Sequence, residues 1–219
     1  MGVSAKDILK DNKKIFLPLG ALLLLVIMAF LFSDSDFGIF DSSFEGIDDS
    51  VKYTEAEYVI DSDTNYSAVI KTTYGDIEID LFEDETPISV NNFVFLAEND
   101  FYDDLTFHKV IKDFIIQGGD PGADSTGDAG YLYSDIITGR KMEEYSVVMA
   151  NAGNTDSNGS QFFIVCGDAD TKSIDGEYTI FGEVVSGTAI VDSICNVSVN
   201  DNYKPINNVE IESVQIVEN

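Results

Sequence analysis

The sequence predicts a mainly β domain, a small closed β-barrel capped at its ends by two α-helices, behind one N-terminal transmembrane helix. Many short segments after residue 66 alternate apolar and polar side chains, which is the pattern of half-buried strands. Two segments of the same region show helical signals instead. An uncharged stretch of 18 residues, 15–32, precedes them near the N-terminus. Many short strands accompanied by two helices are typical of a closed barrel.

The strands are expected to begin with a hairpin. Ile77, Ile79 and Leu81 alternate with polar residues, and a turn at Gly75 separates them from an earlier run around Val69. Further short strands are predicted at 107–117, 145–150, 161–166, 178–184 and 207–217.

Two helices are expected within this series of strands. Thr86 and Pro87 open the first helix, as a capping residue followed by a proline in the first turn. Its buried stripe is predicted to be Val90, Phe93, Val94 and Ala97. The second helix is predicted near 188–195.

The N-terminal apolar segment predicts a membrane anchor. Residues 15–32 would form a helix about 27 Å long, which is sufficient to cross a bilayer. Lysines precede this segment and acidic residues follow it, so residues 1–14 are expected in the cytoplasm and the rest outside. An acidic, serine-rich spacer at 33–65 would hold a domain at 66–219 off the membrane. This arrangement predicts a single-pass protein of the cell membrane with an extracytoplasmic domain.

A cleaved signal peptide is the competing interpretation of the same segment. The apolar stretch is long for a signal peptide, and no small-residue cleavage site follows it, because the exit reads Ala29-Phe30-Leu31-Phe32-Ser33. We therefore favour an uncleaved anchor.

The charge of the chain excludes one class of partner. Forty acidic residues stand against 12 basic ones, for a net charge of −28. Nucleic acid is not an expected partner, since its phosphates require a basic surface. The acid excess indicates either solubility or attraction of basic client peptides, and the second effect would weaken with salt.

The cysteines and the histidine restrict the possible chemistry. Cys166 and Cys195 are the only cysteines; they can form a disulfide, although their spacing does not decide it, and no set of metal ligands accompanies them. His108 is the only histidine, and without a nucleophile motif it is expected to be structural. No cofactor or metal is predicted.

Two motifs indicate a small apolar groove with a few hydrogen-bonding groups. The first runs Phe107-His108-Lys109-Val110-Ile111 and continues from Phe114 to Asp120, with one cation among apolar residues and a Gly-Gly turn. The second comprises Met149 to Gly153 and Gly159 to Ile164. Rotation about an Xaa-Pro bond needs only such a groove and a donor aimed at the proline nitrogen, since no covalent bond is broken.

Both motifs closely resemble the cyclophilin family of peptidyl-prolyl isomerases. The resemblance extends over 66–219 and also includes Thr86-Pro87, Phe101-Tyr102, Asp175-Gly176 and Phe181-Gly182 in the family's order. It implies an eight-stranded antiparallel barrel closed by two helices. It also implies pocket and backbone-binding roles, with Lys109, Gln117 and Asn151 as catalytic residues. The other implied substrate-binding residues are Phe114, Ile115, Met149, Ala150, Gln161, Phe163, Ser173, Ile174 and Tyr178.

The sequence departs from the family pattern inside the groove. Lys109 stands at the position of the family's catalytic arginine. A lysine keeps the positive charge but lacks the planar fork of donors of a guanidinium. Ser173 stands where the family often has tryptophan or histidine, and Tyr178 stands where histidine is usual.

These observations predict a monomeric isomerase that binds proline-containing segments of exported or cell-surface client proteins. The alternative is a chaperone module that binds such segments with weak or no isomerase activity. A barrel for small apolar ligands is a third interpretation, which would require the order of the motifs to be coincidental.

Overall fold

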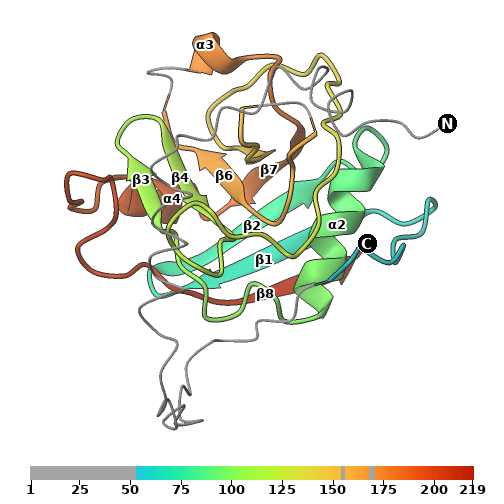
Figure 1. Cartoon of the computed structure of the whole chain (residues 1–219), viewed down its shortest axis with the longest axis horizontal. Coiled ribbons are helices and arrows are strands. Elements are labelled where there is room, and N and C mark those ends of the chain that lie inside the picture. The colour runs from blue at the N-terminus through green and yellow to red at the C-terminus, as the bar shows by residue number, and fades with distance from the viewer. Residues whose placement is uncertain (1–52, 154–155, 168–170) are drawn as a thin grey trace, which may run out of the picture. The chain divides into compact units, whose positions relative to one another are not determined.

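The fold is built around one antiparallel sheet that curls into a half-barrel (Figure 1). A computed structural model describes residues 53–153, 156–167 and 171–219. Within these residues the sheet contains eight strands in the order β3-β4-β6-β5-β7-β2-β1-β8. The strands are β1 (Tyr66–Thr72), β2 (Gly75–Leu81), β3 (Lys109–Ile111), β4 (Ile115–Gly118), β5 (Ser146–Met149), β6 (Phe162–Val165), β7 (Ile180–Ser186) and β8 (Ile211–Glu218).

The sequence predicted a completely closed barrel, but in the structure the two edges of the sheet meet only over a short contact. Strands β3 and β8 lie at the ends of the sheet order and are not paired with each other. The segments that lead into them meet at an isolated bridge between Thr106 and Glu210. Beside it, Phe107 N–H donates to the Val209 carbonyl at 2.9 Å, and Ile211 N–H donates to that of Leu105 at 2.7 Å.

The described residues contain three helices, one more than the sequence predicted. They are α2 (Pro87–Glu98), α3 (Thr171–Ile174) and α4 (Thr188–Cys195). The predicted bounds 188–195 match α4, whereas the single turn α3 was not expected. Thr86 does precede α2, but its hydroxyl donates to the Phe82 carbonyl at 3.2 Å and makes no side-chain cap.

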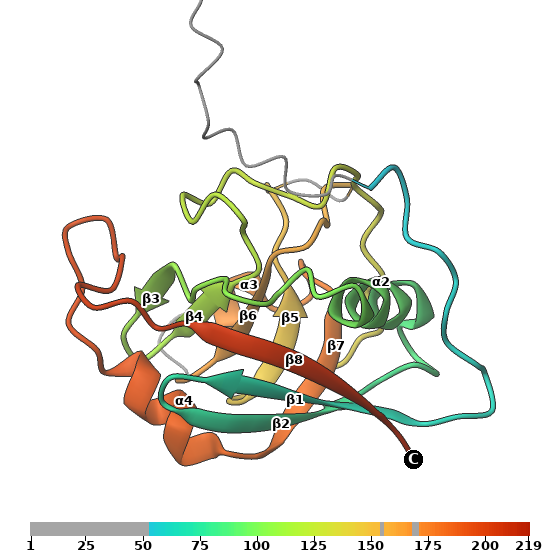
Figure 2. The same cartoon turned by 90° about the horizontal axis from the view of Figure 1, so that it is seen from below.

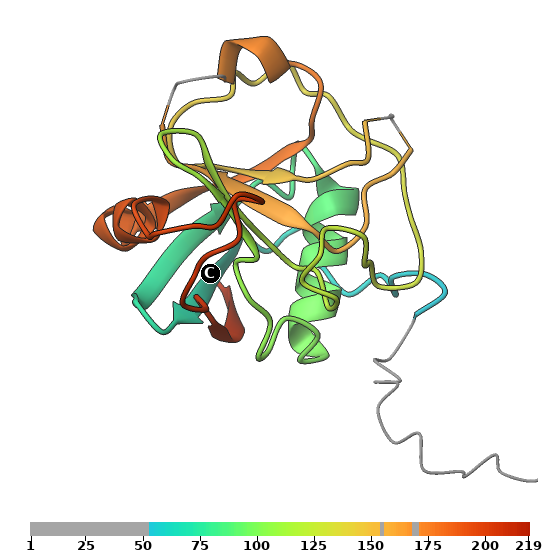
Figure 3. The same cartoon turned by 60° about the vertical axis from the view of Figure 1, so that its left-hand side comes forward.

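The main core lies between α2 and the sheet. The predicted stripe of α2 is buried, with Val90 and Phe93 fully so. Phe93 contacts the rings of Tyr102, Phe162 and Phe181 at centroid distances of 5.1, 5.6 and 5.3 Å. Helices α2 and α4 lie at opposite ends of the half-barrel (Figures 2 and 3).

A second, smaller core lies on the other face of the sheet. It comprises Ile115, Met142, Val148, Phe163, Val165 and Ile180. The two faces follow from strand geometry, in which successive side chains point to opposite sides. This second core forms the base of the groove described below.

The segment before β1, which belongs to the predicted spacer, is packed on the domain. Tyr53 stacks edge-on against Phe95 of α2, with ring centroids 5.0 Å apart. Ile60 is buried, and Val59 N–H donates to Asn91 of α2 at 2.7 Å. We call residues 53–60 the strap.

The predicted membrane anchor, 15–32, and the first part of the predicted spacer lie outside the described residues. No helix within 53–153, 156–167 or 171–219 is long and apolar enough to cross a membrane.

A disulfide joins Cys166 to Cys195, which resolves the alternative that the sequence left open. It connects the residue after β6 with the last residue of α4, and their Cα atoms are 6.2 Å apart. Both cysteines are buried.

Candidate active site

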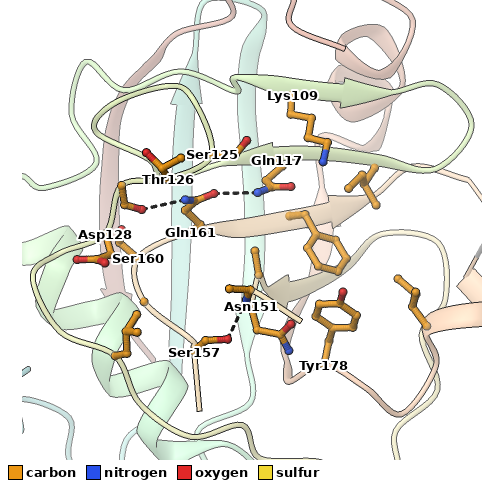
Figure 4. Close-up of a pocket in the computed structure, with 18 of the residues that line it drawn as sticks. Lys109, Gln117, Ser125, Thr126, Asp128, Asn151, Ser157, Ser160, Gln161 and Tyr178 are labelled. Atoms are coloured by element: carbon orange, nitrogen blue, oxygen red, sulfur yellow. Dashed lines mark hydrogen bonds between the residues drawn. The ribbon is translucent and has the colours of Figure 1, made fainter. Parts of the chain in front are cut away.

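The predicted site residues gather around one pocket of about 440 Å³, which lies over β3, β4 and β6 and the loops beside them (Figure 4). Ten of the twelve line it: Lys109, Phe114, Ile115, Gln117, Ala150, Asn151, Gln161, Phe163, Ile174 and Tyr178. These residues come from distant parts of the sequence, and the sheet brings them together.

Strand register explains why the central residues share one face. Lys109 of β3 pairs with Gln117 of β4, and Gln117 pairs with Phe163 of β6. Directly paired residues on adjacent strands project to the same side of a sheet. A cation, an amide and an aromatic ring therefore stand in a row across three strands.

The Lys109 ammonium is directed toward the pocket, on the side of Gln117 (Figure 4). The residue is half-buried, and it makes no hydrogen bond or ion pair with any residue that the structure describes. The charge is therefore available to a bound ligand.

Two glutamines form a hydrogen-bonded chain along one wall. Gln117 Nε2 donates to Gln161 Oε1 at 2.8 Å, and Gln161 Nε2 donates to the Gly127 carbonyl at 2.8 Å. This chain fixes the orientation of both amides. It leaves Gln117 Oε1 without a donor among the described residues, so this atom can accept a hydrogen bond from a peptide N–H.

The Asn151 side chain is held by hydrogen bonds within the protein. Its Nδ2 donates to Asp135 Oδ2 at 3.1 Å and to the Glu177 carbonyl at 3.3 Å, while its Oδ1 accepts from Gly153 N–H at 3.0 Å. The side chain is thus committed to partners within the protein, of which only Gly153 lies in its own loop. The main-chain N–H and carbonyl of Asn151 make no hydrogen bond with a described residue, and they are the groups that an extended peptide can use.

The apolar side of the pocket is formed by aromatic and aliphatic side chains. Phe163 and Tyr178 meet edge to face, with centroids 5.6 Å apart and planes at 82°. Burial raises the pKa of Tyr178, and the neighbouring Glu177 and Asp135 raise it further, so the phenol stays neutral. With Phe114, Ile115 and Ile174 these rings make a cavity suited to a small apolar ring.

Two predicted residues lie elsewhere, which corrects their assignment. Met149 is fully buried in the main core. The alternation of β5 explains this, because Val148, its neighbour, is the residue that pairs with Phe163. Ser173 is exposed on α3 and does not line the pocket, although the next residue, Ile174, does.

A second group of residues also lines the pocket and extends it beyond the apolar cavity. Its members are Ile111, Ser125, Thr126, Gly127, Asp128, Leu132, Ala152, Ser157, Gly159 and Ser160. Ile111, Ala152, Gly159 and Ser160 belong to the two predicted groove motifs but were not singled out, and the others lie outside those motifs. Ser125, Thr126, Gly127 and Asp128 belong to the glycine-rich loop after Asp120, whose composition gives no signal that it would form part of the wall.

The buried carboxylate of Asp120 shapes this loop. It accepts hydrogen bonds from the N–H groups of Gly122, Asp124, Ser125 and Gly127 at 2.5–3.1 Å. Since Gly127 in turn receives the Gln161 amide, the carboxylate supports the glutamine chain through the loop. No cluster of acidic, histidine or cysteine side chains that could hold a metal ion occurs among the described residues.

His108 contacts the same loop and is buried, as expected for a structural histidine. Its Nε2 lies 3.1 Å from the Ser125 hydroxyl. Burial lowers the pKa of His108, although the nearby Asp120 acts in the opposite direction.

Comparison with known proteins identifies the family. The profile of the cyclophilin type peptidyl-prolyl cis-trans isomerase/CLD family matches residues 67–216. The chain belongs to the cyclophilin family. A Dictyostelium discoideum relative, peptidyl-prolyl cis-trans isomerase cypE, is 39% identical over 153 residues, covering 68% of this chain and 96% of the relative.

Other relatives are longer than this cyclophilin domain. The Rhizopus delemar peptidyl-prolyl cis-trans isomerase cyp15 is 41% identical over 155 residues, which cover 68% of this chain but only 24% of that protein. Among solved structures, a Cryptosporidium parvum cyclophilin type isomerase shares 33% identity with a TM-score of 0.67, covering 71% of this chain and 99% of that one. The same protein was also solved in the presence of the dipeptide Ala-Pro, and that structure superposes with a TM-score of 0.65.

Proposed function

We propose that this cyclophilin is a peptidyl-prolyl cis-trans isomerase in which the ammonium of Lys109 is the cation that stabilises the twisted amide. The observation that carries the proposal is the row of Lys109, Gln117 and Phe163 across three paired strands. It sets an available charge and a fixed amide beside an apolar cavity. The isomerases named among the relatives support the same reaction.

The reaction requires stabilisation of a twisted amide. Planarity of the peptide bond imposes a barrier of about 18–20 kcal/mol, and the twisted nitrogen regains a lone pair. In the proposed complex the proline ring sits against Phe163 and Tyr178, while Gln117 Oε1 and the Asn151 main chain hold the flanking peptide. The Lys109 ammonium then donates to the developing lone pair more strongly than to the planar amide, which lowers the barrier.

No arginine can take this role in the pocket. Arg140 is the only arginine in the chain. Its guanidinium donates twice to Glu85, at 2.6 and 3.2 Å, and lies 3.8 Å from the centre of the Phe82 ring. Arg140 lines a different depression, beside Phe82 and Glu183, and is absent from the pocket wall.

A proline-peptide-binding chaperone module with weak or no turnover is the second candidate. The lysine at position 109 favours it, because the three donors of an ammonium radiate from one nitrogen and do not form the planar, two-armed fork of a guanidinium. Loss of one well-aimed donor lowers a rate by about 10²–10³-fold.

Cis–trans exchange of an Ala-Pro peptide, followed by NMR with the detergent-solubilised full chain, separates the two candidates. An isomerase would accelerate exchange, and Lys109→Ala would reduce this by about 10²-fold or more while the peptide still binds. Lys109→Arg should raise the rate if donor geometry limits it. Peptide binding without accelerated exchange would instead establish the chaperone module.

We further propose that the domain works outside the cytoplasm, tethered by the segment at 15–32, on exported or cell-surface proteins. The lysines before this segment and the acids after it support that orientation. The Cys166–Cys195 disulfide supports it independently, since such bonds persist in oxidising compartments. Alkylation of thiols in intact cells provides the test: both cysteines should resist the reagent until reduced, and rapid labelling without reductant would contradict the location.

A further inference from the structure

The strap is tied to α2 by one buried asparagine. Asn91 Oδ1 accepts from the N–H groups of Val59 and Ile60 at 2.7 and 3.3 Å, and Asn91 Nδ2 donates to the Glu57 carbonyl at 2.9 Å. The Asn91 amide thus pairs with main-chain groups of the strap, much as a neighbouring strand would. These hydrogen bonds fix the path of the strap along the helix (Figure 2).

The beginning of the strap reaches a different element. Tyr53 N–H donates to the Ala129 carbonyl at 2.7 Å. The Tyr53 ring packs against Phe95, and it also lies 6.5 Å from the ring of Phe101. Burial raises the pKa of Tyr131, and the Tyr53 phenol adds to this effect.

The element that Tyr53 reaches is a wall of the pocket. Asp128 and Leu132 line the pocket on either side of Ala129, which is itself fully buried. No helix or strand occurs between β4 and β5, so this wall depends on contacts with other elements for its position.

Asn92, the neighbour of Asn91, holds the same wall from inside. Tyr131 donates its hydroxyl to Asn92 Oδ1 at 2.5 Å, and Asn92 Nδ2 donates to the Gly159 carbonyl at 3.0 Å. Gly159 belongs to a second lining segment of the pocket, which packs directly against Asp128 and Leu132. Two consecutive asparagines of α2 therefore hold the strap on one side and two adjoining pocket segments on the other.

We propose that the strap contributes to peptide binding by the groove, and that its residue Tyr53 is a positioning residue for the pocket wall at 128–132. The inference rests on the proposed function only in that the pocket binds proline peptides. Tyr53 holds Ala129 through its N–H, and its ring, packed on Phe95 and Phe101, fixes the position of that N–H. Ala129 in turn sets where Asp128 and Leu132 stand around the ligand. Residues before the barrel thus tune peptide affinity without touching the peptide.

The test compares Tyr53→Ala with the unaltered full chain. Deuterium exchange of the amides at 127–132 should become faster in the variant, because the ring that anchors the Tyr53 N–H against this wall is lost. Affinity for an Ala-Pro peptide should fall by about 2- to 10-fold, the range expected from one aromatic contact. Tyr53→Phe keeps the ring and the backbone donor and should restore both properties.

Two controls distinguish positioning from general destabilisation. Tyr58→Ala removes a side chain of the same strap that is 70% exposed, and should change neither readout. Val191→Ala truncates a buried residue of α4, at the far end of the half-barrel, and should lower stability while leaving the wall and the affinity unchanged. Unaltered exchange at 127–132 in Tyr53→Ala, or an equal effect of Val191→Ala, would overturn the proposal. If the unaltered chain failed to bind proline peptides, the proposed function would fail, and amide exchange alone would still decide the role of Tyr53.

Discussion

At the scale of single residues, His108 links the pocket to the pH of the surroundings. The residue is only 4% exposed, and burial holds its pKa below the ordinary value of 6.5. Among the charged groups facing it, Asp120 favours the protonated ring, whereas Lys109 and Lys204 oppose it. Burial prevails, so the folded protein binds this proton less readily than the unfolded chain does.

This difference predicts a loss of stability in mild acid. The contribution of a neutral His108 is fully present above about pH 6.5 and falls as the pH drops through the interval between that value and the lowered folded pKa. Urea unfolding at about pH 7.5 and about pH 5 measures it. Since the many carboxylates have a pH dependence of their own, the comparison is with His108→Gln, which should lose less stability on acidification. Equal losses in the two proteins would refute the expectation.

Residue chemistry also shows how far the site can be predicted from the sequence. Lys109, Gln117 and Phe163 belong to local runs whose alternation is visible in the chain, and the structure places all three in the pocket. Met149 was misplaced because its motif does not show which face of β5 it occupies; only its pairing partner, Phe162, decides that. For Asn151 the residue was placed correctly, but its side-chain partner Asp135 is 16 residues away and has no sequence signal.

At the scale of elements, the disulfide predicts a measurable contribution to stability. It joins β6 to α4 across a separation of 29 residues. Closing a loop of this size in the unfolded chain is expected to stabilise the domain by about 2–5 kcal/mol. Replacing Cys166 and Cys195 together by alanine should lower the free energy of unfolding by that amount in urea titration. Unaltered protein treated with a reductant is the matched control and should behave like the double variant; coinciding unfolding curves for oxidised and reduced protein would contradict the prediction.

The elements themselves were predicted to different degrees. The strands and α4 follow from periodicity, because half-buried segments expose their pattern directly. The segment predicted as strand at 107–117 is a hairpin of β3 and β4, and its turn needs Asp113 at φ 59°, which the residue type alone did not indicate. Which part of the predicted spacer packs on the domain could not be predicted, because the packing of the strap depends on Asn91, a distant partner whose polar side chain would normally indicate exposure.

At the scale of the whole molecule, the charge of −28 acts on every peptide that approaches the pocket. Asp128 lines the pocket, and Asp135 and Glu177 contact the Asn151 side chain beside it. Around such a site the potential is expected to be negative over distances comparable with the screening length. This field should favour proline segments that carry lysine or arginine.

We therefore expect an Ala-Pro peptide flanked by lysines to bind several-fold more tightly than one flanked by glutamates at low salt. The difference should shrink between ionic strengths of about 0.01 M and about 0.15 M, because the screening length falls from about 30 Å to about 8 Å. Calorimetric titration of both peptides, with a serine-flanked peptide as the uncharged control, measures it. The serine peptide should keep a nearly constant affinity, since its binding depends on the apolar cavity and on the groups around Gln117. If the lysine and glutamate peptides bound equally at low salt, the acid excess would have no role in client choice, and solubility would be its remaining explanation.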